Sequence, residues 1–138
     1  MRQCLIVAFL SIALLSCKKF VQQQEQNAIV QVMTNGVWWV GSYELNDSSI
    51  TGIFNGYTFQ FESNGTVNAI DNGTTTATGT WVGNLDSETI MSNFIGASSP
   101  LNMLNTTWKI ENTTDTSVLA NSMIAGDTAT LVLYNKKP

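Results

Sequence analysis

Apolar and polar residues alternate over short stretches of the chain from residue 37 onward. In the clearest example, Tyr57, Phe59 and Phe61 alternate with polar side chains up to Glu62. A period of two is typical of a strand with one buried face. Similar bursts of aromatic, β-branched and Thr residues, separated by Gly, Asn and Asp, predict further strands. The predicted strands are Trp38–Leu45, Ser49–Phe54, Tyr57–Glu62, Thr66–Ile70, Thr76–Val82, Glu88–Met91, Thr107–Asn112, Ser117–Ala120 and Ala129–Tyr134.

Asn-Gly pairs separate some of these strands. Asn64-Gly65 and Asn72-Gly73 each lie between two predicted strands, and both residue types accept the positive φ angles of a tight hairpin. Consecutive strands are therefore expected to pair as neighbours. The pattern predicts an all-β fold, an antiparallel up-and-down meander of about eight strands, as either a sandwich or a closed barrel.

Two segments depart from the strand pattern. Between residues 94 and 105, Ser99 is a candidate cap and Pro100 a candidate first residue of a short helical turn. Leu101 and Leu104 would then plug one end of a barrel. Residues 28–33 are mostly apolar and fit either a short helix or a strand that docks on the domain.

The N-terminus carries a different hydrophobic pattern. A positive start at Arg2 precedes an apolar run from Cys4 to Leu15 that is interrupted only by Ser11. The run has about 12 residues, whereas a membrane-spanning helix needs ~20. Its length is typical of the apolar core of a signal peptide.

The residues that follow the run, Leu14-Leu15-Ser16-Cys17, resemble the lipobox of bacterial lipoproteins. The resemblance implies cleavage before Cys17 and attachment of acyl chains, palmitate among them, to that cysteine. Two or more acyl chains hold a protein durably on a membrane. The resulting organisation is a signal peptide over residues 1–16, a lipidated cysteine with a Gln-rich tether over 17–35, and a β-domain over 36–138.

Charge limits the possible partners. From Val37 onward the chain has three lysines and nine acidic side chains, a net charge of −6. This balance argues against nucleic acid, which attracts clustered Lys and Arg. The expected partner is a membrane, through the lipid on Cys17. Lys18 and Lys19, in place of acids after that cysteine, favour the periplasmic side of the outer membrane over surface display.

Tryptophan placement favours a barrel. Gly36-Val37-Trp38 resembles the Gly-x-Trp motif that opens the first strand of lipocalins and other calycins, and Gly79-Thr80-Trp81 and Trp108-Lys109-Ile110 extend the likeness over roughly residues 36–135. The resemblance implies a lipocalin-like barrel whose floor is closed by Trp38. The candidate floor or ligand-lining residues are Trp38, Tyr57, Phe59, Phe61, Trp81 and Trp108.

The chain also departs from the lipocalin pattern. It is shorter than most lipocalins, shows no long C-terminal helix and lacks an Arg near the last strand, where Lys136 or Lys137 would have to substitute. These departures argue against a roomy cavity, and in a small barrel side chains alone can fill the interior. Core packing is therefore an alternative role for the aromatic residues.

Catalytic chemistry is sparsely represented. The chain has no His, which removes the commonest general base, the usual Ser and Cys triads and most zinc sites. No cofactor or metal is expected, and the protein is not expected to be an enzyme. A hydrolase would need two carboxyl groups that converge in one cleft; the candidates are Glu44, Glu62, Glu88 and Glu111.

Besides a carboxylate hydrolase, two functions remain open. The first is a non-enzymatic envelope lipoprotein whose barrel binds a small hydrophobic ligand. The second is a structural or interaction module with a filled core that docks on an envelope protein or glycan. Trp39 bears on the second, because neighbouring residues of a strand point to opposite faces, so Trp38 and Trp39 cannot both be buried on the same side.

Overall fold

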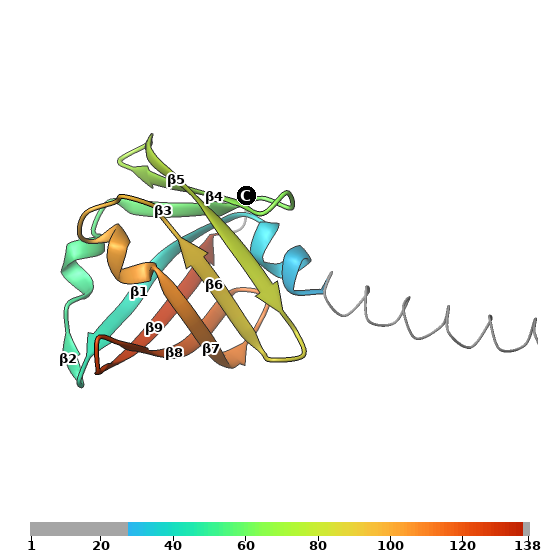
Figure 1. Ribbon diagram of the computed structural model, residues 1–138. Helices are drawn as coiled ribbons and strands as arrows, with labels where there is room; N and C mark the ends of the chain where they lie inside the picture. The colour runs from blue at the N-terminus through green and yellow to red at the C-terminus, as the bar shows by residue number, and fades with distance from the viewer. Residues whose placement is uncertain (1–27, 137–138) are drawn as a thin grey trace, which may run out of the picture.

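The computed structural model describes residues 28–136, which form a short helix and an antiparallel β-barrel (Figure 1). Eight strands close a circuit in chain order, from β1 through β3 to β9 and back to β1, while the two-residue β2 pairs with the end of β1. The strands are β1 (Val37–Leu45), β2 (Ser48–Ser49), β3 (Tyr57–Phe61), β4 (Thr66–Asp71), β5 (Thr74–Asn84), β6 (Thr89–Asn93), β7 (Thr106–Thr113), β8 (Ser117–Ile124) and β9 (Asp127–Lys136). The predicted all-β meander is confirmed, and closure selects the barrel over the sandwich.

Hairpin turns set the order of the strands. Gly65 and Gly73 have φ angles of 87°, and Asn72 has φ 49°, so both Asn-Gly pairs provide the left-handed backbone that their turns require. Ala125 has φ 51° in the β8–β9 turn, before Gly126. Every strand from β3 to β8 pairs with the next one along the chain.

One predicted strand is wrong. Residues 49–54 do not form a strand: Ser48–Ser49 is a two-residue strand, and Thr51–Phe54 is a 3-10 helix, η1. The Thr51 hydroxyl accepts a hydrogen bond from the backbone N–H of Tyr43 at 2.9 Å, and Phe54 is buried. This segment therefore provides hydrogen-bond partners for the backbone of β1 at Tyr43. It lies between β1 and β3, two strands that have only Trp38 and Phe59 as register partners.

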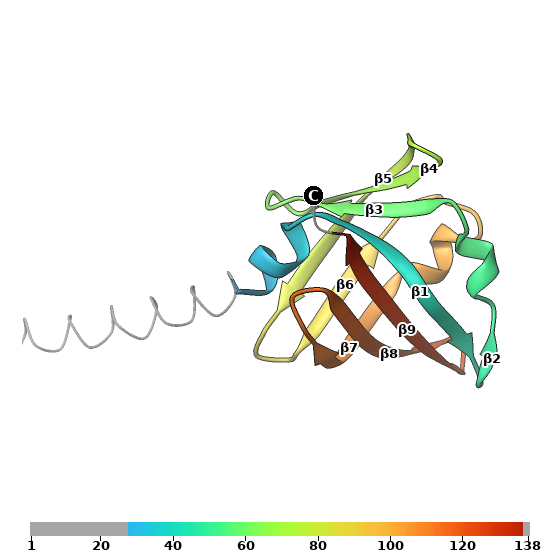
Figure 2. The ribbon, with the colours of Figure 1, turned by 180° about the vertical axis from the view of Figure 1, so that it is seen from behind.

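A second 3-10 helix, η2 (Leu101–Leu104), covers the same end of the barrel as η1 (Figures 1 and 2). Leu101 and Leu104 are both buried, which confirms that they plug this end. The predicted cap is wrong, because Pro100 occupies the N-cap position and no side chain caps the helix. The N–H of Asn102 bonds to the Ser98 carbonyl instead.

The opposite end of the barrel is called the helix end here. It carries the helix of residues 28–34 together with the β3–β4, β5–β6 and β7–β8 turns, and β1 begins there (Figures 1 and 2). Residues 28–34 thus resolve the choice between helix and strand in favour of a helix. Within residues 28–136, no helix has both the length and the apolar character to cross a membrane.

Candidate functional site

Trp38 joins the N-terminal helix to the barrel. Its side chain is fully buried, and its indole N–H donates a hydrogen bond of 2.8 Å to the Met33 carbonyl. That carbonyl lies in the last turn of the helix, where carbonyl groups lack partners within the helix. The Asn135 side chain on β9 adds a hydrogen bond to the Asn35 carbonyl. Trp38 therefore closes the helix end and also fixes the helix across it.

The helix approaches the barrel closely at Gly83 on β5. A Cβ atom placed on Gly83 would lie 2.6 Å from Cγ2 of Ile29 and 3.4 Å from its Cβ. Real contacts of this kind are essentially never shorter than 3.0 Å, so any larger residue at 83 would force the Ile29 side chain to shift. A glycine is needed here for packing, because its φ angle is not positive.

A cavity of about 370 Å³ lies between this helix and the helix end of the barrel. This volume falls at the lower end of the ~300–1,000 Å³ range of small-molecule sites. Seven of its twelve lining residues have large apolar side chains, and the other five are small or polar. The large apolar residues are Ile29, Val32, Met33, Leu85, Ile90, Ile110 and Val118.

A β-bulge shapes one wall of the cavity. The register between β7 and β8 shifts between Ile110 and Asn112, which leaves Glu111 as the extra residue. Bulges re-aim side chains, and here Glu111, Asn112 and Thr113 line the same cavity although they are consecutive. In a regular strand the middle residue would face away.

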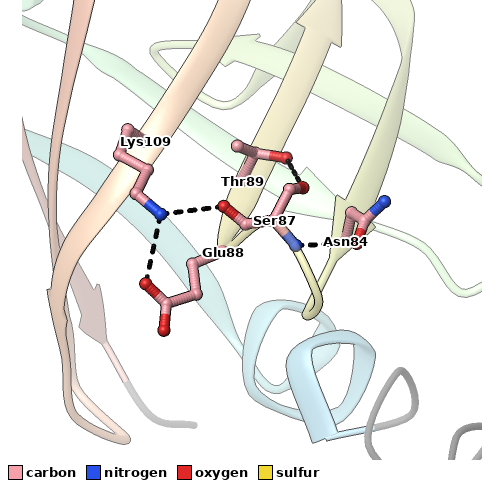
Figure 3. Close-up of polar contacts among 5 residues, drawn as sticks. All are labelled: Asn84, Ser87, Glu88, Thr89 and Lys109. Atoms are coloured by element: carbon pink, nitrogen blue, oxygen red, sulfur yellow. Dashed lines mark hydrogen bonds and ion pairs between the residues drawn. The ribbon is translucent and has the colours of Figure 1, made fainter.

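The β5–β6 turn forms the other rim, and Lys109 on β7 contacts it (Figure 3). The Lys109 ammonium donates to the Ser87 carbonyl at 2.9 Å and pairs with Oε2 of Glu88 at 3.2 Å. Within the turn, Asn84 Oδ1 accepts the Ser87 N–H, and the Ser87 hydroxyl contacts that of Thr89 at 2.8 Å. Glu88, another lining residue, is therefore paired with Lys109 at the rim.

The interior of the barrel is nearly filled by side chains. The void among them measures about 40 Å³, which is room for no more than a few waters. Of the predicted ligand-lining residues, Phe59, Phe61 and Trp108 border this void. All three are buried and act as core, so the larger of these two cavities is the one beneath the helix.

The remaining predicted site residues lie elsewhere. Tyr57 is half-buried and stacks on Phe59, with ring centroids 6.2 Å apart. Trp81 packs edge-on against Phe61 at 5.3 Å, and its indole N–H donates to the Glu62 carbonyl at 2.9 Å. Neither lines the cavity. Trp38 supports the cavity from beneath through Met33, without lining it.

Most of the residues that line the cavity were not among the predicted site residues. Ile29, Val32 and Met33 follow the spacing of one face of a helix, and that spacing was the available signal. Ile110 and Leu85 gave no such signal, because they reach the cavity through a bulge and a turn. Side chains of Lys136 and Lys137, the proposed substitutes for an Arg over Trp38, lie outside the described residues.

The end of the barrel opposite the helix is closed by hydrogen bonds and packing. The buried Tyr43 donates its hydroxyl to the Met103 carbonyl at 2.9 Å and stacks on Phe54 at 5.2 Å. Burial raises the pKa of Tyr43 from 10.0 to about 12, since the ionised phenolate would lose hydration. These residues line neither the cavity beneath the helix nor the void inside the barrel.

Two aromatic side chains are exposed together on the outside of the barrel. Trp39 and Tyr134 are register partners on β1 and β9, each 43% exposed, with ring centroids 5.2 Å apart. The Tyr134 ring lies over Gly41, where a Cβ atom would approach it to 2.2 Å. The expectation that Trp38 and Trp39 point to opposite faces is confirmed, and Trp39 with Tyr134 forms an aromatic pair on the surface.

Two of the four candidate carboxylates meet at one site. Glu88 and Glu111 both border the cavity, whereas Glu44 and Glu62 do not. Both are exposed, while a catalytic carboxylic acid is typically surrounded by apolar groups. No cluster of three or more potential metal ligands occurs within residues 28–136. The predicted lipidation site, Cys17, and the signal peptide lie outside the described residues.

Comparisons with known proteins identify a fold. No protein-family model matches the chain, and no curated protein matches it significantly. A DUF4847 family protein from Bacteroides vulgatus ATCC 8482 is similar in structure, with a TM-score of 0.57 and 14% identity over 80% of this chain and 99% of that one. An uncharacterized protein from Bacteroides eggerthii DSM 20697 matches with a TM-score of 0.48 and 16% identity over 75% and 99%. The first of these structures shows that the barrel fold occurs in another protein.

Proposed function

We propose that this protein is a non-enzymatic envelope lipoprotein, anchored through lipid on Cys17, that binds a small hydrophobic ligand in the cavity beneath the 28–34 helix. The observation that supports this function most is the cavity itself, about 370 Å³ with large apolar walls. Apolar pockets of this size with a few polar groups at the rim are typical ligand sites. We include in this proposal that the barrel is lipocalin-like, but we place the ligand at the helix end and not in the barrel interior.

Binding of a neutral hydrophobic dye tests the ligand site. Nile red should bind the mature chain with Cys17→Ser, and its fluorescence should rise as it leaves water. Val32→Trp places a large ring in the cavity wall and should abolish the signal. Gln31→Trp is the matched control, since Gln31 is exposed on the same helix and does not line the cavity. Equal dye binding by both variants would rule out this site.

The anchor is tested separately. We expect the mature N-terminal peptide to carry acyl chains on Cys17, measured by mass spectrometry of the membrane fraction. Cys17→Ala should release the protein from that fraction or leave it uncleaved. Protease treatment of intact cells should spare the protein if it faces the periplasm from the outer membrane.

A second candidate function is docking on an envelope protein or glycan. The exposed Trp39–Tyr134 pair favours it, because exposed aromatic side chains often act as binding anchors. Crosslinking in whole cells from a photoreactive residue at position 132, next to this pair on β9, should then capture a specific partner. We expect this product to be lost in Trp39→Ala while the barrel remains folded. An unchanged product would exclude the Trp39–Tyr134 pair as the docking site.

A further inference from the structure

The helix end of the barrel is strongly acidic. Its three turns and the bulge carry five acidic residues. Lys109 is the only basic side chain in the described part of the chain, residues 28–135. It is already paired with Glu88. The acidic residues are Glu62, Asp86, Glu88, Glu111 and Asp115.

The cavity combines this charge with apolar walls. Glu88 and Glu111 are the two charged residues that line it, and both stand at its rim, while Ile90 and Val118 lie deeper and also border the interior of the barrel. Each methylene buried against such walls increases affinity about fourfold. The arrangement thus suits a molecule with an alkyl chain inside and a charged group at the mouth.

The negative charge at the mouth of the cavity favours a ligand with a positively charged head group. At about 4–5 Å in water, a carboxylate increases the affinity for a positive unit charge about fivefold and lowers the affinity for a negative one by about the same factor. Cationic and anionic head groups on the same chain should therefore differ by about tenfold or more at low salt. Salt should reduce this difference, because the groups are exposed.

The position of the tether indicates where the ligand comes from. The described chain begins at Ala28, at the helix end, and eleven peptide units separate it from Cys17. Even when fully extended, these units span at most about 40 Å. A lipid on Cys17 would therefore attach the protein to the membrane by the same end that carries the cavity.

We propose that the cavity takes up, from the bilayer, the alkyl chain of an amphiphile whose head group carries an ammonium charge. This inference rests on the proposed function and specifies its ligand class. The alkyl chain packs against Ile29, Val32 and Ile110, and the ammonium group lies beside the carboxylate of Glu111, because the carboxylate of Glu88 is already paired with Lys109. Free fatty acids, with the same chain and a carboxylate head, bind more weakly.

Competition for bound Nile red tests the head-group preference. On the mature chain with Cys17→Ser, near neutral pH, dodecylammonium should displace the dye at a concentration about tenfold lower than laurate. Glu111→Gln should narrow this ratio several-fold. Glu44→Gln, the same change on β1 outside the cavity, should leave the ratio unchanged. Equal competition by the two amphiphiles, with Nile red still bound, would overturn the inference and leave the proposed function intact.

Extraction from vesicles tests the source. The lipidated protein on phosphatidylcholine vesicles that contain a fluorescent alkylammonium should remove the fluorophore from the bilayer, and Val32→Trp should not. If dissolved dodecylammonium binds but nothing is extracted, the membrane source is wrong. If calorimetry detects no binding of Nile red or of dodecylammonium, the proposed function fails together with the inference.

Discussion

Replacing Trp38 by Phe tests whether this residue fixes the helix to the barrel. The change removes the indole N–H that donates to the Met33 carbonyl at 2.8 Å. Trp38 and Met33 are 0% and 1% exposed, so the carbonyl would be left buried without that partner. An unsatisfied buried polar group costs about 1–3 kcal/mol, and the lost ring atoms add roughly 1 kcal/mol. We expect the free energy of unfolding to fall by about 2–4 kcal/mol.

Urea unfolding followed by circular dichroism measures this loss. The control is Trp39→Phe, the same substitution at the adjacent residue, whose side chain is 43% exposed. Surface substitutions of this kind usually stay within ~0.5 kcal/mol. Protease digestion before residue 37 should also accelerate in Trp38→Phe, because the helix loses its main attachment. If the two variants unfold at the same urea concentration, Trp38 does not have the role assigned to it.

Three further predictions concern other parts of the barrel. Burial raises the pKa of Tyr43 to about 12, so its neutral form stabilises the fold below pH 10, and this stabilisation is lost as the pH rises toward 12. Between pH 10 and 12 the thermal midpoint of the wild type should therefore fall more steeply than that of Tyr43→Phe. Parallel curves for the two proteins would contradict the raised pKa. Gly83→Ala forces a Cβ against Ile29, so we expect Nile red affinity to change at least several-fold while strand content stays constant by circular dichroism. Unchanged affinity would show that the dye does not bind against Ile29. Lys109→Ala removes an ion pair whose side chains are 51% and 65% exposed, so the free energy of unfolding, measured in urea, should fall by less than about 1 kcal/mol. A larger loss would mean that the β5–β6 turn depends on this lysine.

The strands were predictable because their local signals are strong. Alternation at Tyr57, Phe59 and Phe61 and the Asn-Gly turns produced the observed hairpins. The predicted strand over residues 49–54 was wrong. The β-branched and aromatic residues of this segment are typical of a strand, whereas the edge of β1 requires Thr51 to turn back toward Tyr43. That requirement is tertiary and has no local signature.

The site was harder to predict than the fold. Trp38, Phe59 and Phe61 were recognised as inward-facing, but whether a barrel encloses space depends on how all its side chains fit together. The cavity arises instead from a bulge at Glu111 and from a glycine that admits the helix at Ile29. A bulge is set by the pairing of two strands, so the sequence of one strand does not disclose it.

Methyl NMR of the protein with bound Nile red most directly tests the claim that the ligand site lies beneath the helix rather than inside the barrel. Ile29 and Ile110 border only the cavity, while Leu131 and Leu133 border only the interior void. We expect dye-to-methyl Overhauser contacts with Ile29 and Ile110 and none with the two leucines. Contacts with Leu131 and Leu133, and none with Ile29, would contradict it.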